Sequence, residues 1–459
     1  MKLEILSLKN HVGKSVEIVG WVFRIRKHSK ITFIDLRDRS SRIQVVLENK
    51  LINFDSNMED LLLINGVVKN RSEQTIGKDQ ELGSIEIEAK SIELISNCSP
   101  LPFSVDGDSS TIDESLRLKY RYLDLRTERM RDNLFKRAVL AKSLRNFFDD
   151  QGFVEIETPC LTKGTPEGSR EYIVPSRLYP GENYVLPQSP QQFKQLLMVA
   201  GIEKYYQLAR CFRDEDSRKD RQPEFTQFDI EMSFTNQEEI MQLLENSIVS
   251  VIQKSFPYLK MSKGKFPIIT YDESMKKFGC DKPDLRNNKS DLRELAFCWV
   301  VDFPMFEIDK QENKISAVHH PFTMPKINSV KDLNKTEKEL LKIKAQAYDL
   351  VLNGFEVAGG SIRIADSQLQ HRVFEILGIS EKETKRRFGH MLEAFHFSPP
   401  PHGGIAIGFD RLAAILCGET SIREVIAFPK TSEAKDLLMG SPSETSDESL
   451  RVLGLKKIR

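Results

Sequence analysis

The most constraining feature of this sequence is a densely charged segment between two runs of strand-forming residues. Residues 212–216 read Phe-Arg-Asp-Glu-Asp, and residues 224–231 read Glu-Phe-Thr-Gln-Phe-Asp-Ile-Glu. The pattern predicts a strand, a long charged loop and a second strand. An arginine at a strand end is placed to fork onto a phosphate with two parallel hydrogen bonds, whereas charge density alone favours a solvated hairpin. The rest of the chain decides between these two interpretations.

Two further segments complete a pattern. Residues 152–159 read Gly-Phe-Val-Glu-Ile-Glu-Thr-Pro, and residues 404–412 read Gly-Ile-Ala-Ile-Gly-Phe-Asp-Arg-Leu. These two segments resemble motifs 1 and 3 of the class II aminoacyl-tRNA synthetases, and the charged segment between them resembles motif 2. The intervening residues that resemble the bacterial aspartyl-tRNA synthetases in particular are 165–170, 188–191, 319–323 and 356–363. One motif alone is weak evidence, but three in the family order favour the nucleotide site.

Composition is that of an ordinary globular protein. The 459 residues are 40% hydrophobic and 29% charged, with a formal net charge of zero, so a nucleic-acid partner requires a local basic patch. No apolar run approaches the roughly 20 residues that span a bilayer, and the first residues lack the apolar block of a signal peptide. The six cysteines form no Cys-x-x-Cys pair, which favours a reducing cytosol over a disulfide framework. We therefore expect a cytoplasmic protein without a membrane segment.

The N-terminal part is predicted to be a β-rich domain. Its five runs of strand-forming residues lie at 16–23, 33–36, 43–47, 61–68 and 85–95. Five short strands in about 100 residues fit an OB-fold barrel. Ser-Pro-Leu-Pro at 99–102 marks the end of this domain, which we assign to residues 1–102. Residues 103–130, rich in Arg and Asp, are interpreted as a hinge.

Residues 131–459 are predicted to form the class II catalytic domain. Apolar residues near helical spacing predict a helix from about Asp132, and Gly152 follows its end. Strands and helices then alternate without the rhythm of a parallel sheet, which favours an antiparallel sheet flanked by helices and an α+β fold. Bacterial members of the family usually have a large inserted domain. Here its two flanks follow one another directly, so the insertion is predicted to be absent near 287–297.

The resemblance implies a two-step reaction. Aspartate attacks the α-phosphate of ATP to give aspartyl-adenylate and pyrophosphate, and the terminal ribose of a tRNA then accepts the aspartyl group. Such chemistry depends on positioning and charge neutralisation more than on a protein nucleophile. The family match assigns catalytic roles to Arg213, Arg411 and Glu356. The ATP-binding residues that it implies are Arg213, Asp214, Glu215, Gln222, Phe225, Glu356, Gly408, Phe409, Asp410 and Arg411.

The family match also implies a Mg²⁺ site at Asp349 and Glu356. Across a strand pair, two such carboxylates are placed to share a magnesium ion that bridges phosphates. Their spacing alone favours ordinary surface carboxylates, so the assignment depends on the resemblance. Phe225 likewise fits either a purine face or a core position.

Selection of aspartate requires cations for its side-chain carboxylate, because a desolvated carboxylate without partners is very costly. The aspartate-binding residues that the resemblance implies are Glu167, Ser189, Gln191, Gln192, Phe193, Lys194, Arg213, Asp229, His319 and Arg363. Asparagine would leave Lys194 and Arg363 without an anionic partner. By spacing alone Lys194 fits an exposed helix position. His319 matches the substrate position better than His320, and two adjacent histidines on a strand would point apart.

A local basic patch does occur in the N-terminal domain. Seven Arg and Lys residues lie between residues 24 and 42, against two acids. OB-folds bind single strands by stacking bases on aromatics and tracking phosphates with cations. The anticodon-binding residues implied by the family are Arg24, Arg26, His28, Phe33 and Gln44. A plain soluble barrel face with a core phenylalanine is the alternative.

The expected partners are tRNA(Asp), L-aspartate and a second copy of the chain, since Pro159 matches the dimer-interface position of motif 1. His28 matches a loop position that is typical of enzymes that also charge tRNA(Asn). Three alternatives stay open: an asparaginyl-tRNA synthetase, a noncatalytic RNA-binding paralogue and an amide-forming ligase on the same fold. Lys194, Asp229 and the ending at 422–430 argue against the first. Retention of the catalytic set argues against the second, and the barrel argues against the third.

Overall fold

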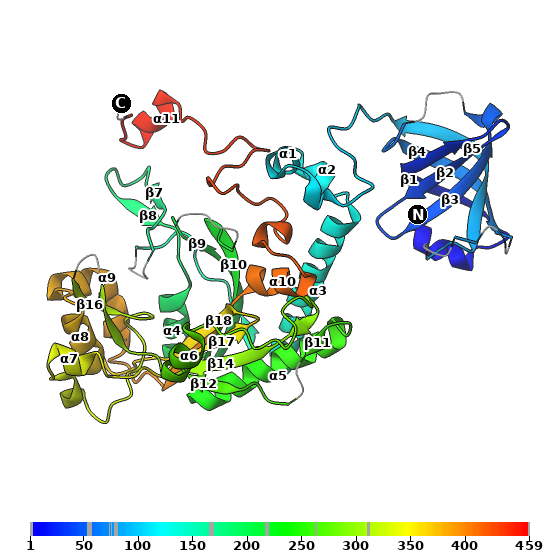
Figure 1. Cartoon of the computed structure of the whole chain (residues 1–459). Helices are drawn as coiled ribbons and strands as arrows, with labels where there is room; N and C mark the ends of the chain where they lie inside the picture. Colours follow the sequence, from blue (N-terminus) through cyan, green and yellow to red (C-terminus); the bar gives the residue numbers. More distant parts are fainter. Residues whose placement is uncertain are drawn as a thin grey trace. The chain divides into compact units, whose positions relative to one another are not determined.

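The computed structural model describes residues 3–52, 57–72, 74, 76–77, 81–164, 169–215, 220–261, 264–309 and 313–457. The chain divides into two compact units, Met1–Ser109 and Ser110–Arg459 (Figure 1). Within the described ranges, no helix is long and apolar enough to cross a membrane.

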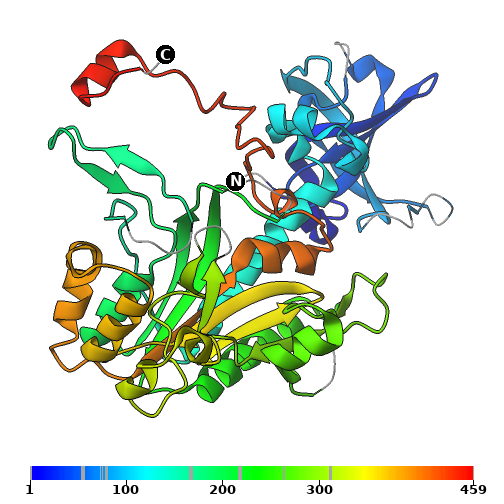
Figure 2. The ribbon, with the colours of Figure 1, turned by 60° about the vertical axis from the view of Figure 1, so that its left-hand side comes forward.

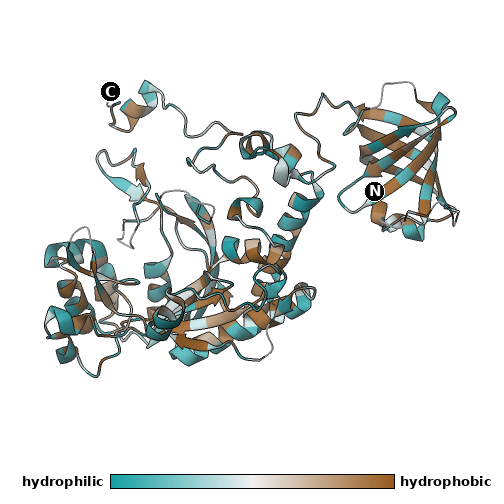
Figure 3. Ribbon diagram, viewed as in Figure 1, coloured by the Kyte–Doolittle hydropathy of each residue, from teal (hydrophilic) through white to brown (hydrophobic). Residues whose placement is uncertain are grey.

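The first unit is a closed barrel with the strand order β1-β2-β3-β5-β4. Its strands are β1 (Ser15–Lys27), β2 (Ile31–Arg37), β3 (Arg42–Glu48), β4 (Leu61–Asn70) and β5 (Ile85–Ser96). Ile18, Val45, Ile64 and Ile87 are fully buried inside it, because alternate side chains of a strand point to one face. Figure 3 shows this alternation as brown and teal bands along the strands. The predicted five-stranded barrel is confirmed.

The second unit is built on an eight-stranded sheet with the order β12-β14-β17-β18-β19-β10-β9-β6. The strands are β6 (Val154–Glu155), β9 (Lys204–Phe212), β10 (Glu224–Ser233), β12 (Ile268–Thr270), β14 (Phe297–Val301), β17 (Ala347–Leu352), β18 (Phe355–Ile362) and β19 (His402–Gly408). Within the described residues of this eight-stranded sheet, only the edge pairs β12–β14 and β6–β9 are parallel. The prediction of an antiparallel sheet flanked by helices is therefore confirmed for its central strands.

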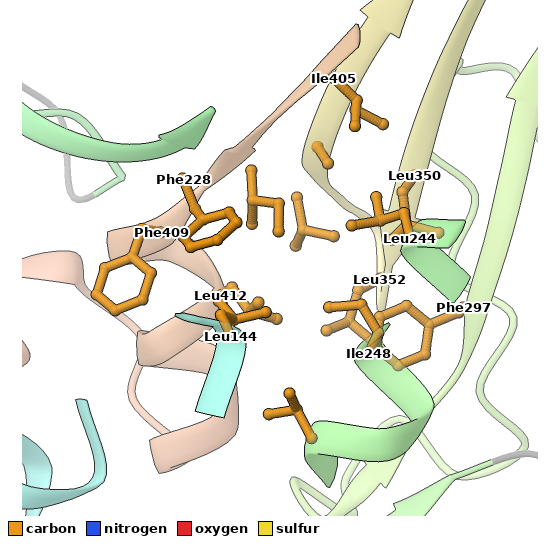
Figure 4. Packing of buried hydrophobic residues seen from close by; sticks show 14 of the residues in the cluster. Leu144, Phe228, Leu244, Ile248, Phe297, Leu350, Leu352, Ile405, Phe409 and Leu412 are labelled. Atoms are coloured by element: carbon orange, nitrogen blue, oxygen red, sulfur yellow. The ribbon is translucent and has the colours of Figure 1, made fainter. Parts of the chain in front are cut away.

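Three helices pack on one face of this sheet: α3 (Glu128–Asp150), α5 (Gln237–Ser255) and α10 (Phe409–Cys417). Figure 4 shows their apolar side chains meeting those of the strands, with Leu144, Leu244 and Leu412 opposite Phe228 and Leu350. In Figure 2, strands β17 and β18 run over helix α5. Because strand side chains alternate, the polar neighbours of Phe228 and Leu350 point to the opposite face.

The remaining elements surround this sheet. Two antiparallel pairs are β7 (Ile173–Pro175) with β8 (Asn183–Val185) and β15 (Phe306–Asp309) with β16 (Lys314–Ala317). A parallel pair is formed by β11 (Lys260–Met261) and β13 (Glu294–Leu295). The helices are α1 (Glu114–Lys119), α2 (Arg121–Asp124), α4 (Gln191–Val199), α6 (Tyr271–Phe278), α7 (Glu337–Leu340), α8 (Ser367–Ile376), α9 (Glu381–Ala394) and α11 (Asp447–Val452). Short 3₁₀ helices lie at Ile5–Asn10 and Asn49–Leu51 in the first unit, at Ser109–Thr111 where the two units meet in the sequence, and at Val330–Leu333 and Ile422–Glu424 in the second unit.

The predicted hinge requires correction from Ser110 onward. Residues 110–130 belong to the second unit and form α1, α2 and the start of α3. Arg121 is buried and donates to the carbonyl oxygens of Ala427 at 2.9 Å and Arg423 at 2.8 Å. A buried arginine that satisfies main-chain acceptors fixes the segment, as a hinge would not. Helix α3 also begins at Glu128, earlier than predicted.

A short link joins α6 to β14. Within it, Asp284 accepts two hydrogen bonds from the side chain of Arg286. Glu294 accepts from the main-chain nitrogens of Asn287 and Asn288, each at 2.9 Å. The link therefore satisfies its own polar groups at the position where the sequence predicts a missing insertion.

Candidate active site

A cavity of about 700 Å³ lies on the face of the sheet opposite to α5, a volume typical of small-molecule sites. Strands β10, β17, β18 and β19, helix α4 and the loop after β9 contribute to its walls. The predicted site residues that line it are Ser189, Gln191, Lys194, Arg213, Glu215, Gln222, Phe225, Asp229, His319, Asp349, Glu356, Arg363, Gly408, Asp410 and Arg411. The fold therefore brings together most of the residues that were chosen from separate motifs.

Four predicted site residues lie elsewhere, and a fifth, Glu167, lies outside the described residues. Gln192 and Phe193 follow Gln191 on α4, but a rotation of about 100° per residue turns them away from the cavity. A contiguous run on a helix cannot face one ligand.

The other two are Asp214 and Phe409. Asp214 forms a half-exposed ion pair with Arg170 at 3.6 Å. Phe409 is 2% exposed in the core, where the guanidinium of Arg137 lies 4.7 Å from its ring centroid. Both expectations of ATP contact through these side chains are therefore corrected.

A buried cluster of four charges forms one end of the cavity. Lys194 donates to Asp229 at 2.6 Å and lies 3.2 Å from Glu231. Arg363 forks onto Glu231 with bonds of 2.9 and 3.1 Å. All four side chains are at most 2% exposed. The predicted orienting role of Asp229 toward Lys194 agrees with this contact, whereas Glu231, which holds both cations, was given no role from sequence.

The two carboxylates of this cluster differ in pKa. Burial raises the pKa of Asp229, and the nearby Lys194 only partly offsets this. Burial also acts on Glu231, but Arg363 and Lys194 outweigh it and lower the pKa to about 2. Glu231 therefore stays ionised and is the main counter-ion of Arg363.

A glycine gives Glu231 its space. A side-chain carbon on Gly404 would lie 2.0 Å from a carboxylate oxygen of Glu231 and 2.1 Å from the carbonyl of Ile230. Gly404 pairs with Glu231 across the β10–β19 ladder. Position 404 of motif 3 therefore requires glycine, because the Glu231 carboxylate occupies the space that a side chain would need.

Both adjacent histidines line the cavity, contrary to the expectation that they would point apart. They follow β16 in a bend rather than within a strand, so the alternation rule does not apply. Arg363 donates to Nε2 of His320 at 2.6 Å, and burial together with Arg363 holds the pKa of His320 well below its usual range. Nε2 of His319 is buried without a hydrogen-bond partner among the described residues.

Arg213 and Phe225 face each other across the β9–β10 hairpin. The guanidinium carbon of Arg213 lies 5.0 Å from the ring centroid of Phe225, and its Nε is buried without a partner among the described residues. Glu215 accepts from Ser169 and from Arg221 at 2.6 Å. Burial raises the pKa of Glu215, but Ser169 and Arg221 outweigh it and leave the pKa below its ordinary value.

Two further lining residues already have main-chain partners. The side-chain amide of Gln222 donates to the carbonyl of Lys430 at 3.0 Å and accepts from its nitrogen at 2.7 Å. Asp410 accepts from the nitrogen of Thr226 at 2.8 Å and pairs with Arg137. Both side chains therefore fix neighbouring walls of the cavity.

Asp349 and Glu356 come together around Gly359. A side-chain carbon there would lie 3.0 Å from Oδ1 of Asp349 and 3.3 Å from Oε1 of Glu356. Oδ1 of Asp349 is buried without a hydrogen bond within the described part of the chain. Burial and the neighbouring Glu356 raise the pKa of Asp349 well above its usual range. The two carboxylates share one small space, which was expected from sequence only through the resemblance.

Arg411 and Lys282 approach Glu356 from its two ends. Arg411 donates to the carbonyl oxygen of Glu356 and to Asp220 at 3.3 Å. Lys282 lies 3.1 Å from the Glu356 carboxylate and also lines the cavity. Sequence reasoning gave Lys282 no role, and its only signal was its place at the flank of the predicted missing insertion.

On the barrel unit, the predicted anticodon residues share one patch. Arg26 pairs across the ladder with Phe33, and it donates to Gln44 at 3.0 Å. The ring of His28 meets that of Phe33 edge-on at 5.5 Å. Arg24 is exposed two residues before Arg26 on β1, so both side chains point to the same face of the strand. Partly exposed aromatics beside cations are suited to stack and track a single strand.

The comparisons with known proteins agree with this geometry. A family model described as tRNA synthetases class II (D, K and N) matches residues 113–432, and one described as OB-fold nucleic acid binding domain matches residues 16–95. The chain therefore belongs to the class II tRNA synthetases of the D, K and N group, with an OB-fold domain before its catalytic unit.

Curated relatives have a more specific name. The aspartate–tRNA(Asp/Asn) ligase of Natranaerobius thermophilus is 39% identical and that of Thermotoga maritima 38% identical, with 97% of both chains covered in each comparison. The first alignment spans 579 positions, 120 more than the 459 residues of this chain. The relatives therefore hold segments without a counterpart here.

Solved structures support the fold. The asparaginyl-tRNA synthetase of Pyrococcus horikoshii, complexed with asparaginyl-adenylate, matches with a TM-score of 0.73 at 20% identity, covering 94% of this chain and 98% of that one. A putative aspartyl-tRNA synthetase from Leishmania major matches with a TM-score of 0.69 at 18% identity, covering 92% of each chain.

Proposed function

We propose that the chain is an aspartate–tRNA ligase, which activates L-aspartate with ATP and transfers it to tRNA. The observation that carries this proposal is the pair Lys194 and Arg363 at the cavity wall. Glu231, His320 and Ser361 accept four of the five N–H bonds of Arg363, which leaves one without an acceptor among the described residues. Both cations offer only donors, so a substrate carboxylate satisfies them and a side-chain NH₂ does not.

Activation requires a cation at the α-phosphate and at the substrate α-carboxylate. Arg213 fits this role, because its guanidinium lacks a carboxylate partner among the described residues and stacks on Phe225. A carboxylate oxygen of aspartate attacks the α-phosphorus, and pyrophosphate leaves with the electrons of the broken bond. Arg411 is placed for the outer phosphates, and Phe225 offers its ring to the purine. Glu215 and Gln222 border the adenine end, where Gln222 acts by fixing the main chain of Lys430.

Asp349 and Glu356 fit a divalent cation. Two carboxylates with an unpartnered buried oxygen are the protein ligands that Mg²⁺ takes when phosphates and water supply the rest. A magnesium ion held there would neutralise charge on the phosphates of ATP. These two acids are the residues we propose as its ligands.

We further propose that both tRNA(Asp) and tRNA(Asn) are acceptors, in line with the names of the curated relatives. The patch around Phe33 is the proposed anticodon site, with His28 against its ring. The cysteine pattern supports a cytoplasmic location.

A homodimer is supported by exposed apolar side chains near motif 1. Phe135 and Val139 lie one turn apart on α3, and Val154 lies on edge strand β6, all of them exposed. Arg145 and Glu155 join this helix to this strand at 2.9 Å. Edge strands with apolar side chains are usually covered. Sedimentation of the protein should give twice the chain mass, and a monomer at micromolar concentration would contradict this.

The decisive experiment is charging of separate tRNA(Asp) and tRNA(Asn) transcripts with labelled aspartate or asparagine. Both transcripts should accept aspartate and neither should accept asparagine. A preference for charging with asparagine would identify an asparaginyl enzyme instead. If neither amino acid supported ATP–pyrophosphate exchange, no adenylate would form and ligase activity would be refuted. Arg213→Ala should lower aspartate-dependent ATP–pyrophosphate exchange by about 10²–10³. Arg210→Ala is the matched control, because Arg210 lies on the same hairpin but pairs with Glu224 at the exposed surface.

A further inference from the structure

Lys282 is a cation that the proposed reaction has not yet used. Its ammonium lies 3.1 Å from Oε2 of Glu356, and its side chain is 41% exposed. It lines the cavity with Arg213 and Arg411. Unlike Arg411, which donates to the main chain of Glu356, Lys282 contacts the carboxylate itself.

Two carboxyl groups share the space that Lys282 borders. Asp349 and Glu356 border the same space around Gly359, and Lys282 supplies a single positive charge. This charge lies against Glu356. Asp349 instead keeps an oxygen without a hydrogen-bond partner in the described structure. The pair therefore retains the capacity to take a stronger cation, which would compete with Lys282 for Glu356.

The main chain of Lys282 is fixed while its side chain is long. Gly354 lies in the turn between β17 and β18 with φ of +87°. A Cβ atom added to Gly354 would lie 3.4 Å from Cβ of Asp284 and 3.9 Å from the carbonyl oxygen of Lys282. The link thus packs on the turn that joins the two strands bearing the acids. A lysine stem has four flexible carbons, so the ammonium can move several ångströms while the backbone stays in place.

We propose that the Lys282 ammonium has two positions: on the carboxylate pair when the cavity lacks nucleotide, and on the pyrophosphate end of ATP when a divalent cation occupies the pair. The inference rests on the proposed function, because a polyphosphate must enter the cavity. In its second position Lys282 stabilises the charge that develops on pyrophosphate as the bond to the α-phosphorus breaks and the bond to aspartate forms. No proton moves to or from Lys282, since an ammonium binds phosphate as a point charge.

The test compares Lys282→Met with the wild type in two binding measurements. Mn²⁺ binding to the nucleotide-free protein, followed by the paramagnetic resonance of unbound Mn²⁺, should become about tenfold tighter because no ammonium competes for the pair. Binding of pyrophosphate at saturating Mg²⁺, followed by calorimetry, should become about tenfold weaker. Lys282→Arg should restore most of the pyrophosphate affinity. Lys289→Met, at an exposed position of the same link, is the matched control and should change neither value.

Unchanged or weaker Mn²⁺ binding in Lys282→Met would overturn the first position, and unchanged pyrophosphate binding would overturn the second. If Lys282→Met fails to fold, the same two binding measurements are made with Lys282→Gln. Failure of the proposed function is distinguishable, because the Mn²⁺ titration needs no nucleotide, aspartate or tRNA. Aspartate-dependent ATP–pyrophosphate exchange by the wild type tests that function separately.

Discussion

Glu231→Gln is the substitution that most directly tests the buried charge cluster. It preserves the shape of the side chain but removes the charge that holds Arg363 by two hydrogen bonds and lies 3.2 Å from Lys194. Among the described residues, Asp229 would remain as the only carboxylate that pairs with either of the two buried cations. We expect a large loss of stability, because an uncompensated buried charge is costly.

The magnitude follows from the pKa of Glu231. A tenfold change in proton affinity corresponds to about 1.4 kcal/mol. The fall of the Glu231 pKa from 4.5 to about 2 therefore corresponds to about 3 kcal/mol of stabilisation of the ionised carboxylate. Breaking a buried pair by removing one partner typically costs about 3–5 kcal/mol, which agrees. For a catalytic unit that extends from Ser110 to Arg459, this loss lowers Tm by about 4 °C.

Scanning calorimetry of the catalytic-unit transition measures this effect. Glu238→Gln makes the same chemical change at an exposed position of α5 and should leave Tm within about 1 °C. Saturating aspartate should raise the Tm of Glu231→Gln more than that of the wild type, because the substrate carboxylate compensates the cation left without its partner. Asparagine should not produce this difference.

The reasoning would be refuted if Glu231→Gln were as stable as the Glu238→Gln control. It would also fail if aspartate and asparagine raised the Tm of Glu231→Gln equally, because the cluster would then not distinguish a carboxylate from an amide. A loss of stability without any response to aspartate would separate a structural role of Glu231 from the proposed substrate site.

Three other predictions follow from the geometry. Gly359→Ala places a carbon 3.0 Å from Asp349 Oδ1 and 3.3 Å from Glu356 Oε1, so Mn²⁺ affinity measured by titration should fall about tenfold; unchanged affinity would exclude this space as the metal site. Phe33→Ala should weaken tRNA binding by about 1–3 kcal/mol in a filter-binding assay and leave ATP–pyrophosphate exchange unchanged. The lowered pKa of Glu231 means that its stabilisation is complete above pH 4.5 and lost as pH falls toward about 2. The Tm difference between wild type and Glu231→Gln should therefore narrow below pH 4.5, and a constant difference would contradict the assignment.

The strands of the site were the most predictable part of the fold. Alternation along β10 places Phe228 and Ile230 in the core and Asp229 on the opposite face, as a period of two requires. The ladder then sets Gln227 opposite Gly408, which joins the second and third motifs in space. Sequence order alone indicates that these motifs belong together, but only the hydrogen-bonded register shows that they are neighbours.

The errors arose where a contiguous motif was transferred as a block. The resemblance implies aspartate contacts for all of residues 191–194, including Gln192 and Phe193, although a helix cannot turn four consecutive side chains to one side. Phe409 begins α10 and packs into the core for the same reason. Glu231 was given no role from sequence, although it is an acid two residues after Asp229 and therefore on the same face of β10. Its role depends on Gly404 from a distant segment, and that contact is not visible in a local pattern.

The link between α6 and β14 joins two parts of the cavity wall in a chain that is shorter than its curated relatives. At its start Lys282 contacts Glu356, and at its end β14 pairs with β17, which contains Asp349. Between them, Asp284 and Arg286 satisfy each other through two hydrogen bonds. Among the described residues of this link, no buried side-chain nitrogen or oxygen lacks a hydrogen-bond partner. We infer that the two acids are positioned by the β17–β18 hairpin, and that Lys282 is positioned by the link that packs against the turn of this hairpin.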